Sequence, residues 1–171
     1  MKRSYLIFSI ALAALIVFSG CQKTQGTGAE SGVKGSEQAP AEAAMDTSSP
    51  AVATIVVGST PFSVEIAETS AQKEHGLMGR ESLPENAGMW FVFDKPVTDS
   101  FWMKDTLIAL DLIFVDENLK VVYVFANAVP GSTDMITSPV PYQYVLEVNA
   151  GAAAKYNIKA GDVVEKRVGT K

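Results

Sequence analysis

Three apolar side chains run directly into adjacent charges in residues 101–106, which read FWMKDT. Aromatic rings beside polar groups are typical of ligand sites, where an apolar wall carries a few placed hydrogen-bonding groups. Trp102 can supply such a wall, and Lys104 and Thr106 can supply the polar groups. The same segment could also be the end of an ordinary core strand, and both interpretations stay open.

Asp111 is the acid whose position is most informative. In LDLIFVD (residues 110–116), strand periodicity places Asp111 on the same face as two β-branched side chains. A carboxylate on such a face must be paired, hydrogen-bonded or protonated, because an isolated buried charge is very costly. Lys104 and Arg80 are the candidate partners. A hairpin that joins residues 101–103 to this run would bring Lys104 beside Asp111.

Several interpretations of this polar cluster remain open. In the first, the cluster orients a ligand against the platforms of Trp90 and Trp102, and its candidate residues are Arg80, Trp102, Lys104, Thr106, Asp111 and Glu147. In the second, the charges form a structural ion-pair network. In the third, Asp105 or Asp111 works with Glu147 as the carboxylate pair of a hydrolase, a mechanism defined by the separation of the two groups. In the last, the domain is an interaction module without a pocket. We favour binding over catalysis and assign no catalytic residue.

Other chemistry is disfavoured by the motifs that the chain lacks. It contains no GxxxxGK or GxGxxG phosphate loop and no GxSxG nucleophile elbow. Zinc takes three or four nitrogen, sulfur or carboxylate ligands, and this chain has one histidine, His75, and one cysteine, Cys21. We therefore expect no metal and no cofactor, and we expect His75 to be a partly exposed residue near a helix end.

The first elements that must position these residues are a hairpin and a short helix. Residues 54–58 (TIVVG) and 61–67 (PFSVEIA) are β-rich runs separated by a turn signal. Thr69 and Gln72 have the spacing of a capping box, and Gly76 is placed to end the helix that follows.

The rest of the chain is dominated by strand patterns. GMWFVF (residues 88–93) predicts a strand buried on both faces, and further strand-forming runs are SFWM, LDLIFVD, VVYVFANAV, YQYVLEVN and the final VVEKRV. Seven or eight short strands with one or two short helices predict a mainly β, compact single domain with an antiparallel, barrel-like sheet. The absence of long crossover helices in the pattern disfavours a doubly wound α/β sheet.

Residues 1–20 are typical of a targeting segment. Two basic residues precede an apolar run, Tyr5–Phe18, which is shorter than the roughly 20 residues that a membrane-spanning helix needs. Residues 19–22 (SGCQ) resemble the lipobox of bacterial lipoproteins. That resemblance implies that residues 1–20 are a lipoprotein signal peptide and that Cys21 becomes the acylated, palmitate-bearing N-terminus.

The lipobox resemblance also implies a location. Cys21 would anchor a cell-envelope protein to a membrane through its acyl chains, of which more than one gives stable anchoring. Gln22 replaces the aspartate that retains some lipoproteins in the inner membrane. This implies the outer membrane, facing the periplasm, if the source has two membranes, and otherwise the outer face of the cell membrane. Acylation would use the only thiol, and one cysteine cannot form an intramolecular disulfide.

Residues 21–53 predict a lipidated cysteine followed by a flexible tether. The tether is rich in Gly, Ala, Ser and Glu and has no aromatic residue. As a coil, it would hold the domain on the order of 30 Å from its anchor. Residues 54–171, the predicted β-rich domain, carry ten of the 14 basic and fifteen of the 19 acidic residues. This acidic balance disfavours nucleic acid as a partner and leaves a small molecule, a glycan or an envelope protein.

A series of short motifs in the folded part resembles the prokaryotic family named domain of unknown function 192. The motifs cover about positions 60–167 in the family's order, and they are GLM-x-R, GM-x-F-x-F, FWMK-x-T, LD-x-x-F, YVLE-x-x-x-G and I-x-x-GD. The resemblance implies one compact, mostly β domain that is frequently exported, and it implies no particular activity. Ala109 stands where the family usually has proline, and Asp105 where asparagine is common. Asp111 and Glu147 are therefore better acid candidates than Asp105.

Overall fold

A hairpin forms at the first pair of β-rich runs. In the computed structural model, which describes residues 51–167, β1 (Val52–Val57) pairs antiparallel with β2 (Thr60–Ala67). Gly58 has a φ of +59°, a conformation that glycine adopts without a steric penalty, and this permits the tight turn between the strands. β1 begins two residues before the predicted start of the domain. The predicted signal peptide, Cys21 and nearly all of the tether lie outside the described residues.

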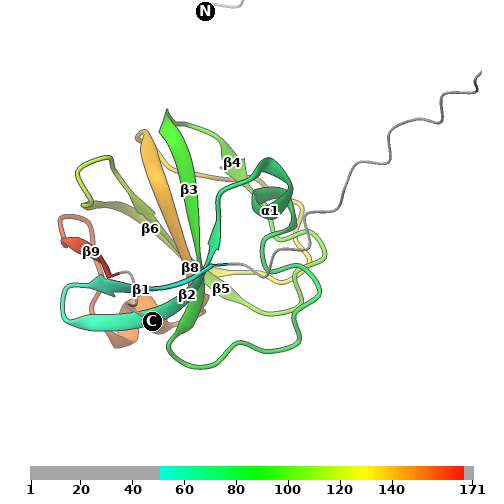
Figure 1. Ribbon diagram of the computed structural model, residues 1–171. Helices are drawn as coiled ribbons and strands as arrows, with labels where there is room; N and C mark the ends of the chain where they lie inside the picture. Colours follow the sequence, from blue (N-terminus) through cyan, green and yellow to red (C-terminus); the bar gives the residue numbers. More distant parts are fainter. Residues whose placement is uncertain (1–50, 168–171) are drawn as a thin grey trace, which may run out of the picture. The chain divides into compact units, whose positions relative to one another are not determined.

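Nine strands and two short helices follow one another along the described chain (Figure 1). After the first hairpin they are α1 (Ser70–His75), β3 (Ala87–Val97), β4 (Ser100–Phe101), β5 (Leu110–Val115), β6 (Val121–Ala128), β7 (Ile136–Thr137), β8 (Tyr142–Asn149), α2 (Ala152–Lys155) and β9 (Val164–Arg167). Seven strands form one sheet in the order β6-β5-β8-β3-β2-β1-β9, and β4 pairs with β7 in a separate ribbon. The predicted mainly β class is confirmed.

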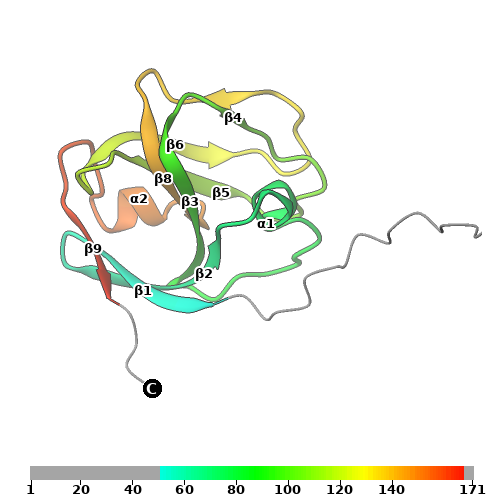
Figure 2. The ribbon, with the colours of Figure 1, turned by 45° about the horizontal axis from the view of Figure 1, so that its top comes forward.

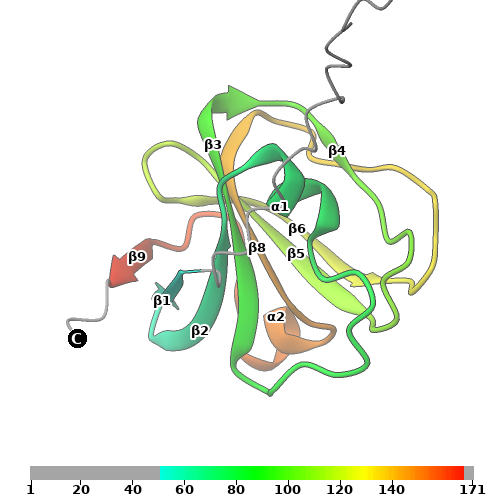
Figure 3. The ribbon, with the colours of Figure 1, turned by 45° about the vertical axis from the view of Figure 1, so that its right-hand side comes forward.

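The large sheet curls into a half-barrel, as Figures 2 and 3 show from two sides. Its two edge strands meet at one end, where Lys120 and Val163 form an isolated antiparallel bridge. All pairs in this sheet are antiparallel except β2 with β3, because α1 and the turns after it carry the chain across between these two strands.

Each face of the sheet buries its own hydrophobic cluster. All seven strands contribute to the inner cluster, which lies inside the curl and includes Trp90, Ile113 and Leu146, with Ala152 and Ala153 of α2 packed against them. The outer cluster includes Phe91, Leu112, Phe114 and Val145 and is covered by Leu77, Phe101 and Met103. Accordingly, α1 and α2 lie on opposite sides of β3 in Figure 2. β5 is buried on both faces, with its side chains alternating between the clusters as predicted.

One row of residues across the outer face fixes the position of Glu147. Glu65, Met89, Glu147 and Leu112 are successive partners on β2, β3, β8 and β5. Gly88 allows β3 and β8 to approach closely, because a Cβ atom there would collide with the carbonyl oxygen of Glu147. Glu147 thus lies on a central strand, flanked by an apolar side chain on each side.

The short helix α1 forms at the predicted capping box. The Thr69 hydroxyl accepts from the backbone N–H of Gln72, and the Gln72 side chain accepts from the backbone N–H of Thr69. Gly76, with a φ of +49°, ends the helix as predicted. No residue of α1 is buried, so the helix lies on the surface and is held by its cap and by Leu77, which follows it into the outer cluster.

The pairing of β4 corrects one expectation. Residues 101–103 do not form a hairpin with β5; Phe101 instead pairs with Ile136 on β7, and β5 pairs with β6 and β8. The aromatic ring of Phe101 packs edge-on against Phe91 and Phe114, which secures β4 over the outer face. The connection from residue 102 to residue 109 is therefore a loop that crosses the outer face.

Both clusters draw only on residues 53–164. A fragment of residues 45–171 therefore contains the complete core of the described part, and such a unit can fold on its own. Within residues 51–167, neither helix has the length or the apolar character needed to cross a membrane.

Candidate functional site

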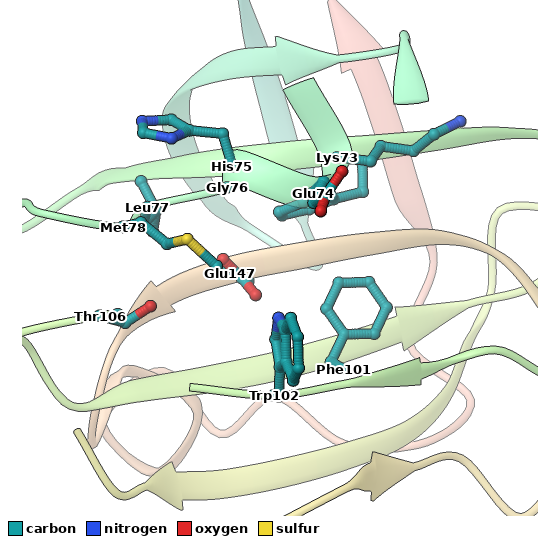
Figure 4. Close-up of a pocket in the computed structure, with 11 residues that line it drawn as sticks. Lys73, Glu74, His75, Gly76, Leu77, Met78, Phe101, Trp102, Thr106 and Glu147 are labelled. Atoms are coloured by element: carbon teal, nitrogen blue, oxygen red, sulfur yellow. The ribbon is translucent and has the colours of Figure 1, made fainter. Parts of the chain in front are cut away.

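A groove lies on the outer face between α1 and the segment that carries Trp102. We call it the Trp102 groove. It comprises a small cavity of about 30 Å³ and two outer hollows of about 270 and 340 Å³, and Glu74 and Trp102 line all three. A cavity of this size has room for one or two water molecules. The small cavity is lined by residues 73–78 of α1 and the following turn, and by Phe91, Phe101, Trp102, Thr106 and Glu147 (Figure 4).

Backbone hydrogen bonds hold the two walls of the Trp102 groove together. The N–H of Gly79, just after α1, donates to the carbonyl of Asp105 at 2.9 Å. The N–H of Met103 donates to the carbonyl of Ser132, and the N–H of Gly131 donates to the carbonyl of Thr106. Asp105 has a φ of +56°, which turns the loop sharply before Thr106. Asp105 is exposed and does not line the small cavity.

Glu147 forms the polar floor of the groove. Its side chain projects from β8 toward the space between Met78, Thr106 and Trp102 (Figure 4). It is only 5% exposed, and within residues 51–167 no side chain or backbone group hydrogen-bonds to its carboxyl group. Burial raises the pKa of Glu147 to about 8, because the charged form is disfavoured away from water. This carboxyl group is therefore largely protonated at neutral pH.

Thr106 and Trp102 complete the wall that faces α1. Thr106 is buried, and the contact of its hydroxyl with the carbonyl of Lys104 is long, at 3.5 Å, so the hydroxyl remains available to a ligand. Trp102 is 38% exposed, which is unusual for so large an apolar side chain, and the ammonium of Lys104 lies 5.4 Å from the centre of its ring. Trp102, one of the two apolar platforms suggested by the sequence, thus lies in the wall of the groove with part of its ring exposed.

Asp111 lies on the opposite face, where it has a structural role. It is completely buried, with its Oδ1 accepting from the backbone N–H of Asn127 at 2.8 Å and its Oδ2 from that of Ala153 at 2.9 Å. Asn127 has a φ of +58° and lies where the register between β5 and β6 shifts. Asp111 thus stabilises a β-bulge on one side and the start of α2 on the other. Of the three predicted alternatives, paired, hydrogen-bonded or protonated, the structure shows a hydrogen-bonded Asp111, and the predicted partners Lys104 and Arg80 are wrong.

Arg80 also lies apart from the Trp102 groove. Its guanidinium pairs with Glu65 at 2.5 Å, and the two line a separate hollow beside Gly88. The side chain of Met89 stands between Glu65 and Glu147 in the row across the sheet, because β3 separates β2 from β8. The structure therefore brings together Trp102, Lys104, Thr106 and Glu147 of the predicted site, and it leaves out Arg80 and Asp111.

Trp90, the other predicted platform, belongs to the inner cluster. Its ring is fully buried and stacks on Tyr144 with the ring centres 5.2 Å apart. Its indole Nε1–H has no hydrogen-bond partner among the residues described. The continuous apolar run of β3 gave no indication of which face Trp90 would occupy.

The sequence reasoning missed the contribution of α1. Lys73, Glu74, His75 and Met78 line the Trp102 groove, and His75 is exposed at the helix end, as expected for that residue. The composition of the helix could have indicated this contribution. A capped helix without an apolar face must lie on the surface, where its polar side chains can line a neighbouring groove. Within residues 51–167, no three side chains of His, Cys, Asp or Glu are arranged to hold a metal ion.

Comparison with known proteins places this geometry in a family. The pattern of the family DUF192, described as an uncharacterized ACR, matches residues 53–166. The chain belongs to the DUF192 family. The matched region of this DUF192 protein covers all nine strands, apart from the first residue of β1 and the last residue of β9, and every residue named in the Trp102 groove.

Two crystal structures share the fold of this DUF192 protein. One is a protein of unknown function from Novosphingobium aromaticivorans DSM 12444, with 37% identity, a TM-score of 0.67, and coverage of 79% of this chain and 99% of its own. The other, from Sinorhizobium meliloti 1021, is provisionally described as a transcription regulator, with 33% identity, a TM-score of 0.67, and coverage of 69% and 95%. No protein with a curated description matches the chain.

Proposed function

We propose that this DUF192 protein is a lipid-anchored protein of the cell envelope whose β domain binds a ligand in the Trp102 groove. The observation that carries the binding proposal is Glu147, a buried carboxyl group without a partner that faces a cavity beneath an exposed tryptophan. Among residues 51–167, the side-chain polar atom that is both sealed from solvent and unpaired is Trp90 Nε1, so the carboxyl oxygens of Glu147 open into the cavity, where a ligand can reach them.

The composition of the groove also supports ligand binding. Phe101, Trp102 and Met78 supply apolar surface, while Glu147 and the hydroxyl of Thr106 supply a few polar groups, the usual mixture in a small-molecule site. The acidic domain argues against nucleic acid as the ligand, whatever description the relative from Sinorhizobium meliloti carries.

Ligand screening on the 45–171 fragment tests this proposal. A ligand that binds the native state must raise the thermal midpoint, and envelope glycans, small organic ions and metal ions form the screening set. Trp102→Ala and Glu147→Gln should abolish the shift produced by any hit. Glu117→Gln, in the exposed turn after β5, is the matched control and should leave it unchanged. If a ligand still raises the thermal midpoint of both groove variants, that ligand binds elsewhere.

The envelope location rests on residues outside the described part of the chain. The supporting observations are the short apolar run, the SGCQ sequence and the absence of aromatic residues from the tether. Globomycin treatment should leave an unprocessed precursor, and Cys21→Ala should leave an unprocessed precursor that carries no palmitate label. A mature, membrane-bound product in the Cys21→Ala strain would contradict the proposed anchor.

A hydrolase is the second candidate function, and its support is a second acid in the same groove. Glu74 lines the small cavity together with Glu147, and a protonated carboxyl group is what a general acid requires. The pair predicted earlier does not exist, because Asp111 lies on the opposite face and Asp105 does not line the cavity. Glu74→Gln distinguishes the two functions: it should abolish turnover by a hydrolase and only weaken ligand binding by a binding protein, because the Glu74 carboxylate is exposed at the rim of the groove.

A further inference from the structure

The chemistry of the Trp102 groove indicates the charge of its ligand. Glu147 lies between Met89 and Leu112 on neighbouring strands, and no cation of the described chain pairs with it. We infer that the groove binds an organic cation, an ammonium group on an apolar stem, with the ammonium against Glu147 and the stem along Trp102. This inference rests on the proposed binding function and specifies its ligand class.

The aromatic faces of the groove already accept cations from the protein itself. The ammonium of Lys104 lies over Trp102, and the ammonium of Lys73 lies 4.8 Å from the centre of the Phe93 ring at the other end. The negative face of an aromatic ring attracts such groups, most strongly for tryptophan. Lys104 reaches this position from the loop beside the groove, and a ligand cation would compete with it for the same ring.

The charged groups around the groove are compatible with a cationic ligand. The acids are Glu147 at the floor, Glu74 at the rim and Asp99 at the far end. The two lysines already have partners other than Glu147: the ammonium of Lys73 donates to the carbonyl of Val92 at 3.0 Å, and that of Lys104 lies over Trp102. His75 is exposed at the outer edge. The small cavity has room for an ammonium-sized group, and the hollows beside it leave room for a stem.

Proton release should accompany binding. Because burial raises the pKa of Glu147 to about 8, the carboxyl group carries its proton in roughly nine-tenths of molecules at pH 7. An ammonium group placed against it favours the charged form and lowers this pKa. A neutral ligand that accepts a hydrogen bond from the protonated carboxyl group would have the opposite effect, so the direction of proton movement reports the charge of the ligand.

Three probes with one stem test the inference: n-butylammonium, 1-butanol and butyrate. Each is titrated at pH 7 into the 45–171 fragment, with NMR signals read from the Trp102 indole and from the side-chain carboxyl carbon of Glu147. Butylammonium should bind at least tenfold more tightly than 1-butanol, and it should move the Glu147 carbon signal toward its ionised value. Glu147→Gln should remove the tenfold preference and leave the weak affinity for 1-butanol.

Lys104→Gln supplies a test in which the affinity for butylammonium should rise rather than fall. Without its internal competitor, the Trp102 face should bind butylammonium about two- to fivefold more tightly, the equivalent of one exposed cation–π contact. Lys120→Gln, in the turn between β5 and β6, is the matched control and should have no effect.

The outcomes separate the inference from the proposed function. Preference for butyrate or 1-butanol, with signals that depend on Trp102, would overturn the cation assignment and leave a binding groove. Weaker butylammonium binding by Lys104→Gln would also overturn it, because Lys104 would then be a contact rather than a competitor. If no probe perturbs Trp102 or Glu147 and the ligand screen is also negative, the binding function itself fails.

Discussion

The two faces of the sheet each carry one tryptophan and one buried acid, and the two pairs behave differently. On the inner face, Trp90 is fully enclosed and both oxygens of Asp111 accept backbone N–H groups. On the outer face, Trp102 is partly exposed and Glu147 has no partner within residues 51–167. Burial alone therefore does not identify a functional acid. The hydrogen bonds that a buried acid makes or lacks distinguish a structural carboxylate, such as Asp111, from one that is free to bind a ligand, as proposed for Glu147.

The largest difference should appear between the two tryptophans. Trp90→Ala should lower the free energy of unfolding by about 3–5 kcal/mol, because it leaves a cavity in the inner cluster. Trp102→Ala should lower it by only about 1 kcal/mol, because part of that side chain is already in water. Urea denaturation of the 45–171 fragment measures both. Equal losses would show that Trp102 is a core residue and would remove it as a platform.

Asp111→Ala should produce the next largest effect. It leaves the buried N–H group of Ala153 and the partly buried N–H group of Asn127 unsatisfied, at a cost of about 3 kcal/mol in the free energy of unfolding. Asp116 is a matched control, since its carboxylate also accepts two backbone N–H groups, from Asn118 and Lys120, but in an exposed turn. Asp116→Ala should cost about 1 kcal/mol or less, because water can replace the lost acceptor. Near-equal losses would refute the structural importance of burial at Asp111.

Glu147 should make stability fall as the pH rises. Its pKa is raised from an ordinary value of 4.5 to about 8 by burial, so between these values the native state holds a proton that the unfolded state has lost. Between these two pKa values, Glu147 should therefore lower the free energy of unfolding by about 1.4 kcal/mol for each unit of increase in pH. Urea denaturation of the wild type and of Glu147→Gln from pH 5 to pH 9 measures this contribution, which is the difference between their free energies of unfolding at each pH. A difference that does not change with pH would mean that Glu147 has an ordinary pKa.

Local patterns in the sequence predicted the elements of this fold well. The capping box at Thr69 and the end of the helix at Gly76 follow from side-chain and backbone preferences that act within a few residues. Alternation in β5 also assigned Asp111 to a face with β-branched neighbours, and that assignment is correct. These inferences succeeded because each depends on residues close together in the chain.

Pairings between distant segments were predicted poorly. The expected hairpin between residues 101–103 and β5 was wrong because the chain after Thr106 crosses the outer face instead of turning back, and Phe101 pairs with β7. That error also produced the wrong partner for Asp111. The β-bulge at Asn127 and the helix α2, which supply its real partners, are remote in the sequence and carry no local mark of this role.

By itself, the sequence of this DUF192 protein determined the positions of most strands and of α1, the mainly β class and which residues share a strand face, because these depend on periodicity and capping. It also identified Trp102, Thr106 and Glu147 as candidates. Only the tertiary structure decided that Glu147 lies beneath α1 without a partner while Asp111 has two. The physical reason is that the surroundings of a buried carboxyl group are set by long-range strand pairing, whereas its face is set by its own strand.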